Sequence, residues 1–316
     1  MRIREARRRS RNNTGVGMNY PRNRNRCVRP VLCALAGAAL ALLPGCGVET
    51  GGGEGIITFG PHITEVVFAL DEGGRVIAVD DYSDYPPPVQ ALPKVGANIN
   101  PALEKITLLE PEMILAAGAN EKMAAHARLN KIPVFNIHMD SFETIGAGIE
   151  RIGELLGCPR AARALHAEFD ADIAGVDEAL SEIEPLKTLI ITGRTTHDLN
   201  TLHTVGGASF VSEVVELAGG RNIFRDTKRP YFEASKETVV ARAPEVIVEF
   251  HCGEGLTEKQ RAAYRRDWEA LPTLPAVRGK RIHFVTASHG LRPGPRIVEI
   301  ARALAFKLHP RARMLL

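Results

Sequence analysis

The sequence predicts an α/β protein in which two Rossmann-like lobes with parallel sheets are joined by one long helix. Short runs of β-branched residues alternate with amphipathic stretches, which is typical of strands followed by helices in a parallel sheet. One long helical pattern interrupts this alternation near the middle of the chain, and the segments on either side of it repeat each other. Residues 46–316 exceed the length of one usual domain and suit two lobes.

Residues 1–45 differ in composition from the rest of the chain. They hold ten of the 40 basic residues, all arginine, and one of the 37 acidic residues. The uncharged stretch Val31–Leu43 is too short to span a bilayer, and the motif LPGC ends in Cys46. This order predicts a lipoprotein signal peptide that is cleaved before Cys46, whose thiol is then acylated. An ordinary secretory peptide is the alternative, and the true start is either Met1 or Met18.

The signal peptide implies a membrane-anchored lipoprotein of the periplasm or cell envelope, with the choice of membrane left open. Once residues 1–45 are removed, 30 basic and 36 acidic residues leave a net charge of −6. This mildly acidic balance argues against a nucleic-acid partner, which requires clustered lysine and arginine. Beyond Cys46 the cysteines are Cys158 and Cys252, which are far apart in sequence and exclude a disulfide framework.

Residues 46–55 are rich in glycine and predict a flexible tether. An N-terminal lobe is expected over residues 56–158, where β-branched runs and amphipathic stretches alternate. Strands are expected at 56–60, 76–81, 113–118 and 132–138, and helices at 64–70, 103–109 and 121–130.

A connecting helix is expected over residues 159–185. Phe169, Ile173 and Val176 recur at the helical period on one face, with acidic residues on the other. A helical run of some 25 residues is roughly 37 Å long, enough to join two lobes, and Pro185 should end it.

A C-terminal lobe is expected over residues 186–316, where the alternation resumes. Strands are expected at 188–193, 245–250 and 281–286, and helices at 211–217, 258–271 and 296–308.

An internal repeat links the two predicted lobes. Glu104 lies seven residues before the sequence Pro-Glu-Met-Ile, and Glu237 lies seven residues before Pro-Glu-Val-Ile. Upstream, TEVVFAL at 64–70 is echoed by SEVVELA at 212–218, and Gly-Gly-Arg follows each closely. Two homologous lobes place a cleft between them, and such clefts are the usual ligand sites.

Catalytic motifs are not found in this sequence. It has no GxSxG elbow, P-loop, HExxH pair, zinc-type cysteine pairs or GxGxxG turn at a strand end. We therefore do not expect an enzyme, a resident cofactor or a metal site. A secreted lipoprotein hydrolase with scattered catalytic residues is the alternative from another functional class.

Several segments resemble one family, the helical-backbone solute receptors for cobalamin and ferric siderophores. They are GPHITEVVFAL, DDYSDYPP, NPALEKITLLEPEMILAAG, TVGGASFVSEVVELAGGRNIF, RPYFEASKETVVARAPEVIV and RPGPRIVEIARAL, and they cover nearly all of residues 56–308. The DYSDYPP and GGRNIF segments look closest to the cobalamin-binding branch. The resemblance implies a monomer that binds a ligand between two lobes and delivers it to the permease dimer of an ABC transporter.

The resemblance also implies two docking residues. In this family one exposed glutamate in each lobe pairs with arginines of the permease, and those positions match Glu104 and Glu237. A glutamate in the first turn of a helix also favours the positive end of the helix dipole, so a structural role is the alternative.

Ligand contacts in the family come from loops at the carboxyl ends of strands. The matching residues here are His62, Tyr82, Asn98, Arg194, Tyr231, His289 and Arg292, with Ala117–Asn120 and Arg296 nearby. Tyr82 and Tyr231 are favoured because a phenol offers a flat apolar face to a macrocycle. Asn98 and Ala117 depart from the large aromatic residues that cobalamin receptors carry there. Each of these side chains could instead serve packing or turn structure.

The ligand class is therefore either a corrinoid or, as the alternative, a ferric siderophore or haem. A corrinoid requires broad apolar faces, whereas an anionic ferric chelate prefers several arginines. Arg194, Arg229 and Arg292 keep the second class open. A receptor for free zinc or manganese would require three or four convergent ligands, which the spacing does not indicate.

Overall fold

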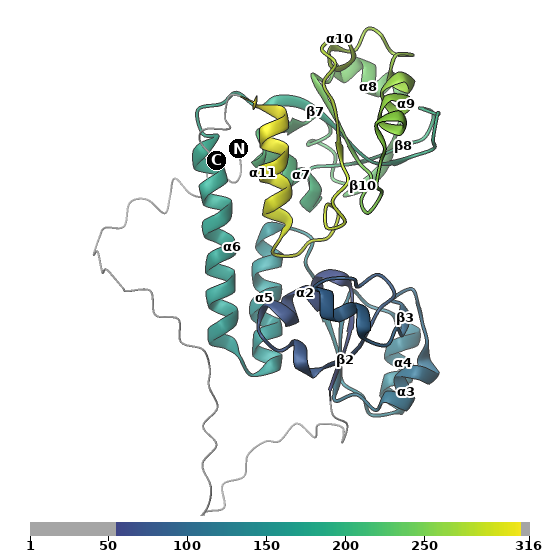
Figure 1. Ribbon diagram of the computed structural model, residues 1–316, viewed down its shortest axis with the longest axis vertical. Coiled ribbons are helices and arrows are strands. Elements are labelled where there is room, and N and C mark those ends of the chain that lie inside the picture. The colour runs from purple at the N-terminus through teal and green to yellow at the C-terminus, as the bar shows by residue number, and fades with distance from the viewer. Residues whose placement is uncertain (1–54, 311–316) are drawn as a thin grey trace, which may run out of the picture. The chain divides into compact units, whose positions relative to one another are not determined.

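The computed structural model describes residues 55–310, so the predicted signal peptide, Cys46 and most of the tether lie outside the described residues. Figure 1 labels the elements in chain order. The described chain contains two main sheets, which are separated in sequence by two long helices. We call the first sheet with its helices the first lobe and the second sheet with its helices the second lobe.

The first lobe contains a fully parallel four-stranded sheet of order β2-β1-β5-β6. Its strands are β1 Ile56–Phe59, β2 Val76–Val79, β5 Met113–Ala117 and β6 Val134–Ile137. The helices are α2 Pro61–Ala69, α3 Leu103–Leu109, α4 Glu121–Leu129 and α5 Phe142–Leu156. The short β3 Gly96–Ala97 and β4 Asn100–Pro101 pair with each other, and η1 Gly73–Arg75 and η2 Pro87–Ala91 are 3₁₀ turns.

Alternate residues of these strands pack into two separate cores. Ile56 and Leu115 join the core that also contains buried residues of α2 and α5. Ile57 and Ala116 join a smaller core with Ile106 of α3 and residues of α4. Because side chains alternate across a strand, a sheet with both faces covered must be apolar at successive positions, as the sequence is here.

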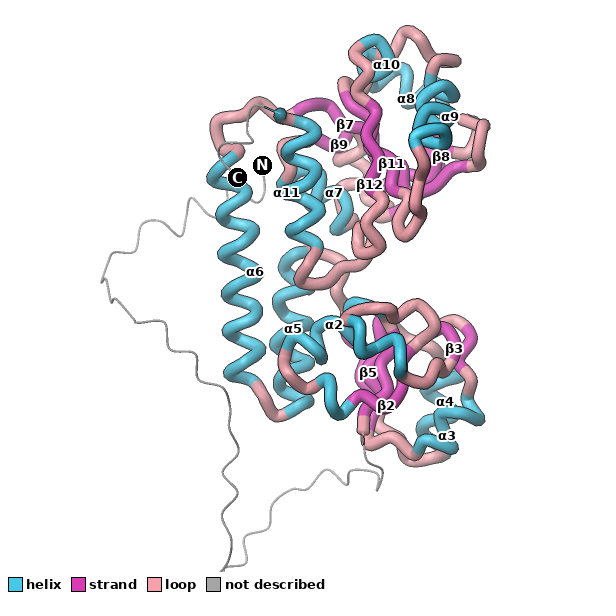
Figure 2. The backbone as a smooth tube through the Cα atoms, viewed as in Figure 1, coloured by secondary structure: helices cyan, strands magenta, loops and turns pink. Residues whose placement is uncertain are grey.

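α6 Pro159–Ala179 is the predicted long helix, and it packs along α5 (Figure 2). Gly153 of α5 permits this close approach, because a Cβ there would lie 2.2 Å from the Cβ of Ala162. α6 also packs against helices of the second lobe, where Arg302 bonds Asp172 at 2.6 Å. This helix therefore contacts both lobes.

α6 ends earlier than the sequence suggests, at Ala179 rather than at Pro185. The ring of Pro185 would clash with the carbonyl of Ser181, and the residue before a proline avoids the helical conformation. Ser181 instead donates its hydroxyl to the carbonyl of Glu178 at 2.7 Å. At 1.5 Å per residue the observed helix is about 31 Å long.

The second lobe contains a six-stranded sheet of order β10-β8-β7-β11-β12, with β9 also paired to β7. Its strands are β7 Leu186–Arg194, β8 Leu202–Val205, β9 Gly220–Asn222, β10 Tyr231–Ala234, β11 Val246–Phe250 and β12 Ile282–Val285. β7, β11 and β12 are parallel, as predicted, and β9, which the sequence did not predict, pairs parallel to β7. β8 runs antiparallel to both β7 and β10, an addition that the sequence reasoning did not identify.

Helices cover both faces of this second sheet. They are α7 Phe210–Leu217, α8 Lys236–Arg242, α9 Glu258–Trp268, α10 Pro275–Arg278 and α11 Ile297–Leu308. Val246 and Val248 of β11 face the core with residues of α7 and α11. Ile247 faces a second core that contains Trp268 at the end of α9.

The internal repeat is visible in the structure. α3 and α8 each have one buried residue, Ile106 and Val239, and each ends in a left-handed residue that is not glycine. These end residues are Glu110 with φ 43° and Ala243 with φ 46°. Each is followed by Pro-Glu and then by a central strand of the sheet.

Within residues 55–310 no helix is long and apolar enough to cross a membrane.

Candidate functional site

Arg292 joins the two lobes. It lies in the loop between β12 and α11, and its guanidinium donates two hydrogen bonds to the carboxylate of Asp84 in the loop after β2. It also donates to the carbonyl oxygen of Tyr82 at 3.4 Å. The hydrogen bond from Arg292 holds the pKa of Asp84 below its usual range. In this structure the cation expected to face a ligand is therefore paired within the protein.

Arg296 forms a second contact between the lobes. Its Nη2 donates to Glu65 of α2 at 2.7 Å, and the Glu65 side chain is only 6% exposed. The guanidinium also lies over the ring of Tyr85, 3.5 Å from the ring centroid. The charge of Arg296 is thus paired with a carboxylate and stabilised by an aromatic face, while its buried Nε has no hydrogen-bond partner among the described residues.

Glu213 forms a third contact between the lobes, from α7 to the start of α5. Its Oε2 accepts a hydrogen bond from the backbone N–H of Phe142 at 2.7 Å. Burial raises the pKa of the Glu213 carboxyl. Glu65 and Glu213 occupy the same position in the repeated sequences TEVVFAL and SEVVELA. Equivalent glutamates of the two lobes thus each contact the other lobe.

His62 lies in the first turn of α2 beside the same loop. A Cβ placed on Gly294 would lie 3.3 Å from the His62 Cβ, so the two segments are in contact. Burial lowers the pKa of His62 to about 4, and the charge of Arg292 adds to the effect. The imidazole is therefore neutral at physiological pH, the form in which it can ligate a metal.

His289 lies in the loop between β12 and α11 as well. Its Nε2 is 3.3 Å from the carboxylate of Glu299, but the orientation does not make a hydrogen bond. Burial and then the charge of Arg296 lower the pKa of His289. Such a neutral, unpaired ring nitrogen is available to a further partner.

Tyr82 and Tyr231 are both exposed, at 64% and 53% of their surface. Tyr82 follows β2, and Tyr231 is the first residue of β10. Desolvation raises the pKa of the Tyr231 phenol, and the charge of Asp140 in the first lobe adds to the effect. An exposed tyrosine offers a bound molecule a flat apolar face and a hydroxyl at its edge.

A buried hydroxyl network that the sequence reasoning missed supports the loop of Tyr82. Thr64 Oγ1 is 2.7 Å from Thr58 Oγ1 and 2.9 Å from Ser83 Oγ, and Ser83 in turn bonds the buried carboxylate of Asp80. Burial raises the pKa of Asp80. Because Ser83 and Asp80 flank Tyr82 in sequence, these bonds restrain the loop that presents the phenol.

Asn98, Ala117 and Asn120 are brought together beside the end of β5. The Asn98 amide donates to the carbonyl of Ala117 at 2.9 Å, and the Asn120 amide donates to the carbonyl of Asn98. The Asn98 Oδ1 is buried and has no hydrogen-bond partner among the described residues. A buried acceptor without a partner is costly, so this oxygen could accept a bond from a bound molecule.

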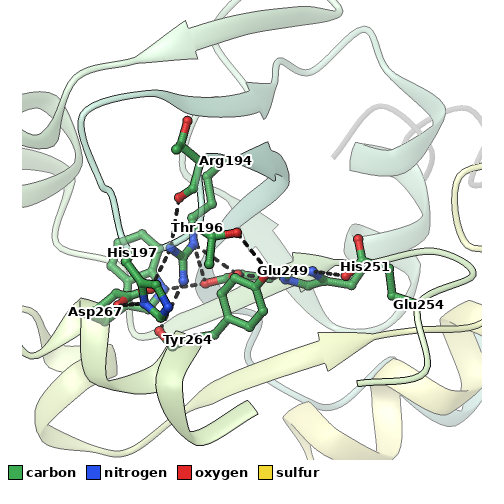
Figure 3. A network of polar contacts seen from close by, with 10 residues as sticks. Arg194, Thr196, His197, Glu249, His251, Glu254, Tyr264 and Asp267 are labelled. Atoms are coloured by element: carbon green, nitrogen blue, oxygen red, sulfur yellow. Dashed lines mark hydrogen bonds and ion pairs between the residues drawn. The ribbon is translucent and has the colours of Figure 1, made fainter. Parts of the chain in front are cut away.

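Arg194 has a different environment from the one expected, because its side chain is 1% exposed inside the second lobe. It donates to Glu249 of β11 at 3.2 Å and to Asp267 of α9 at 2.8 Å (Figure 3). It also lies over the ring of Tyr264, at 4.7 Å. The guanidinium is therefore fully engaged in the lobe interior, and we do not include Arg194 in the ligand site.

The same network extends in two directions from Glu249 and Asp267 (Figure 3). Glu249 is 3.0 Å from His251, which is also 3.2 Å from Glu254. The hydrogen bond to Glu249 raises the pKa of His251. At the other end, His197 Nδ1 lies 3.1 Å from Asp267. Within residues 55–310 no group of three or more histidine, cysteine, aspartate or glutamate side chains is placed to hold a metal ion.

Glu104 and Glu237 are both exposed in the first turn of their helices. Each lies two residues before the buried anchor of its helix, and two helical residues are separated by about 200°. The carboxylates therefore point away from the core. Hydrogen bonds from its own backbone and from Ser235 lower the pKa of Glu237.

A hollow of about 550 Å³ lies beside Glu237 in the second lobe. We call it the α8 hollow; its lining residues are His197, Asp198, Leu199, Lys236, Glu237, Val240, Ala241, Asp267, Ala270 and Leu271. The sequence reasoning did not identify it, because its walls come from the loop after β7, from α8 and from the end of α9.

The chain is similar to several known proteins. The vitamin B12-binding protein of Vibrio parahaemolyticus is 27% identical over 245 residues, which cover 77% of this chain and 85% of that protein. The vitamin B12-binding protein of Yersinia pestis is 29% identical over 197 residues, which cover 62% and 69%.

Solved structures show the same fold. The periplasmic vitamin B12 binding protein of Vibrio cholerae matches with a TM-score of 0.68 and 26% identity, covering 82% of this chain and 98% of that one. A periplasmic heme-binding protein from Roseiflexus sp. RS-1 matches with a TM-score of 0.68 and 24% identity, covering 83% and 100%. The model of the periplasmic binding protein family matches residues 56–287. The chain therefore belongs to the periplasmic binding proteins, a family of solute-binding proteins.

Proposed function

We propose that this protein captures cobalamin or a related corrinoid outside the cytoplasm and delivers it to an ABC importer. The observation that carries this proposal is the pairing of the arginines near the junction of the lobes. Arg292 is paired with Asp84 and Arg296 with Glu65. An anionic catecholate or citrate chelate requires free cations, whereas a corrinoid requires broad apolar contacts.

The exposed side chains at this junction favour the same ligand. Tyr82 and Tyr231 offer flat aromatic faces for the corrin ring. The Oδ1 of Asn98 and the Nε2 of His289 are buried and have no hydrogen-bond partner among the described residues, so a small movement of their loops would offer them to amide groups at the ring edge. The vitamin B12-binding proteins among the similar proteins described above agree with a corrinoid ligand.

Haem or a ferric siderophore is the second candidate. The neutral imidazole of His62 favours it, because a neutral ring nitrogen is a ligand for a metal centre. Arg229 is exposed and adds a cation. The fold is shared with solved heme-binding proteins, so the fold alone does not distinguish these ligands.

Delivery requires docking, which we assign to Glu104 and Glu237. Both carboxylates are exposed on matching helices of the two lobes and are available to arginines of a permease dimer. We further propose that acylation of Cys46 anchors the protein to a membrane and that it works as a monomeric receptor without catalytic activity. A generic ester and phosphate panel tests the hydrolase alternative, and turnover would favour it.

An absorbance and thermal-shift titration tests the ligand. Residues 47–316 are titrated with cyanocobalamin, cobinamide, haem and ferric siderophores. Saturable stabilisation by corrinoids alone is the expected result. If the protein binds a ferric chelate but none of the corrinoids, it is still a solute receptor and the proposed ligand is wrong.

A charge-reversed variant tests docking. The double variant Glu104→Arg, Glu237→Arg should lose uptake in cells while its ligand affinity stays within about twofold, because both residues lie on exposed helix faces. Normal uptake by this variant would exclude the docking role.

A further inference from the structure

We propose that the α8 hollow receives a segment of the importer's membrane subunit in which an apolar side chain lies next to an arginine or lysine. This inference rests on the proposed function, because it takes the importer as the partner. It goes beyond the pairing of Glu237 with a cation, since it adds a shaped apolar pocket next to that carboxylate.

Five of the lining residues are apolar: Leu199, Val240, Ala241, Ala270 and Leu271. Val240 is 37% exposed, although it lies in a helix beside the main core of the lobe. An apolar hollow with charged side chains at its rim can take up an apolar side chain that lies next to a charge.

The charge of the rim selects a cationic partner. Asp198 and Glu237 contribute carboxylates, and Asp267 adds one that is already paired with Arg194, whereas Lys236 is the lysine among the lining residues. Lys236 donates to the side chain of Asn200 at 2.7 Å, and Glu237 forms no ion pair within residues 55–310. A partner cation would therefore meet an excess of negative charge.

The wall behind the hollow is rigid. Asp267 is held by the buried Arg194 at 2.8 Å and by His197 at 3.1 Å. Arg194 is fixed in turn by Glu249 of the central strand. A pocket whose walls are already ordered loses little entropy when a partner binds.

The first lobe differs at the same place of the repeat. α3 has Leu108 where α8 has Ala241, and Leu108 is 83% exposed. α8 therefore has a small side chain beside the α8 hollow, whereas α3 projects a large apolar one into solvent. The volume of the hollow lies within the range of pockets that hold ligands larger than one side chain. We therefore infer that the second lobe receives an apolar anchor, whereas the first lobe projects one.

The test fills the hollow without changing its charge. Ala241→Trp and Ala270→Trp are compared with Ala262→Trp, a matched control at an exposed α9 position that does not line the hollow. Binding is measured to liposomes that carry the permease and ATPase subunits of each metal-chelate importer of the source organism. Cyanocobalamin binding and the melting temperature are measured on the same samples.

Both filling variants should bind the importer liposomes at least tenfold more weakly, whereas the control should change less than twofold. Asp198→Asn should weaken binding at low salt more than at high salt, because charge attraction is screened. Wild-type affinity of both filling variants would overturn the inference. If the filling variants weaken docking but the wild type binds no corrinoid, the result supports the role of the α8 hollow and contradicts the proposed ligand. If the wild type binds none of the importers, both this inference and the proposed delivery fail.

Discussion

The two lobes share one structural repeat but differ at the centre of their sheets. Five residues after the repeated proline, the first lobe has Ala116 in β5 and the second has Glu249 in β11, and both are fully buried. Ala116 packs in an apolar core, whereas Glu249 is bonded by Arg194 and by the indole of Trp268. The same arrangement of strands and helices thus accommodates a buried charge in the lobe whose neighbouring elements supply its hydrogen-bond partners.

The lobes also differ in how their equivalent glutamates contact the opposite lobe. Glu65 pairs with a guanidinium, whereas Glu213 accepts a backbone N–H. The first contact joins two charges, and the second places a carboxylate at the start of a helix, where it forms no ion pair within residues 55–310. Substitutions at these equivalent positions should therefore change the stability of the protein by different amounts.

Removing the buried charge should have the largest effect. Glu249→Gln removes the charge that Arg194, His251 and the Trp268 indole share and leaves Asp267 as the charged partner of Arg194, so the free energy of unfolding should fall by about 3–5 kcal/mol. Urea denaturation of residues 47–316 measures this change. The exposed carboxylate of Glu233 is a matched control, and Glu233→Gln should cost less than about 1 kcal/mol. Equal effects of the two variants would show that the buried network does not stabilise the second lobe.

Acid should destabilise both lobes through one histidine in each. Burial lowers the pKa of His62 and of His283 to about 4, from 6.5. The unfolded chain binds these protons first, so the contribution of these two histidines to stability is constant well above pH 6.5 and falls as pH decreases toward 4, by at most about 3 kcal/mol per histidine. His62→Gln and His283→Gln should each flatten this part of the pH profile. An unchanged profile would contradict the burial of the neutral imidazoles.

The equivalent glutamates should respond differently to neutralisation. Glu65→Gln removes the charge opposite Arg296 and should cost about 1–3 kcal/mol. Glu213→Gln still offers an oxygen to the N–H of Phe142 and removes a carboxylate whose pKa burial raises, so it should cost less than about 1 kcal/mol. Thermal denaturation compares the two variants, and the reverse order would contradict the assigned contacts.

Freeing Arg292 should have the smallest effect on stability. The Asp84 side chain is 50% exposed, so Asp84→Asn should cost less than about 1 kcal/mol. The released guanidinium should strengthen binding of an anionic ferric chelate but leave cyanocobalamin binding nearly unchanged. A competition titration measures the affinity for both ligands. Equal changes in the two affinities would show that the charge of Arg292 does not determine which ligand binds.

The regular parts of the fold could be predicted because their signal is local. Buried parallel strands are short apolar runs, and the repeat aligned Glu104 with Glu237 by spacing. β8 and β10 escaped prediction because LHTV and YFEA are short and mix polar with apolar residues. Their pairing depends on long-range contacts that periodicity does not reveal.

The candidate site was harder to predict because ion pairs depend on tertiary structure. Arg292 and Asp84 are 208 positions apart, and no local pattern connects them. The buried position of Arg194 could have been anticipated from the sequence. Glu249 lies in the apolar run EVIVEF, and a carboxylate in a buried strand requires a partner such as a cation nearby. Tyr82 and Tyr231 were predicted as ligand contacts and are exposed, and their role stays a prediction.

The central claim is that the paired arginines leave a site suited to a neutral corrinoid. Equilibrium titration of residues 47–316 with cyanocobalamin at low and at high salt tests it most directly. Saturable binding whose Kd changes little with salt is the expected result, because Arg292 and Arg296 are paired within the protein. Failure to bind cyanocobalamin, together with salt-dependent binding of a ferric chelate, would contradict the claim.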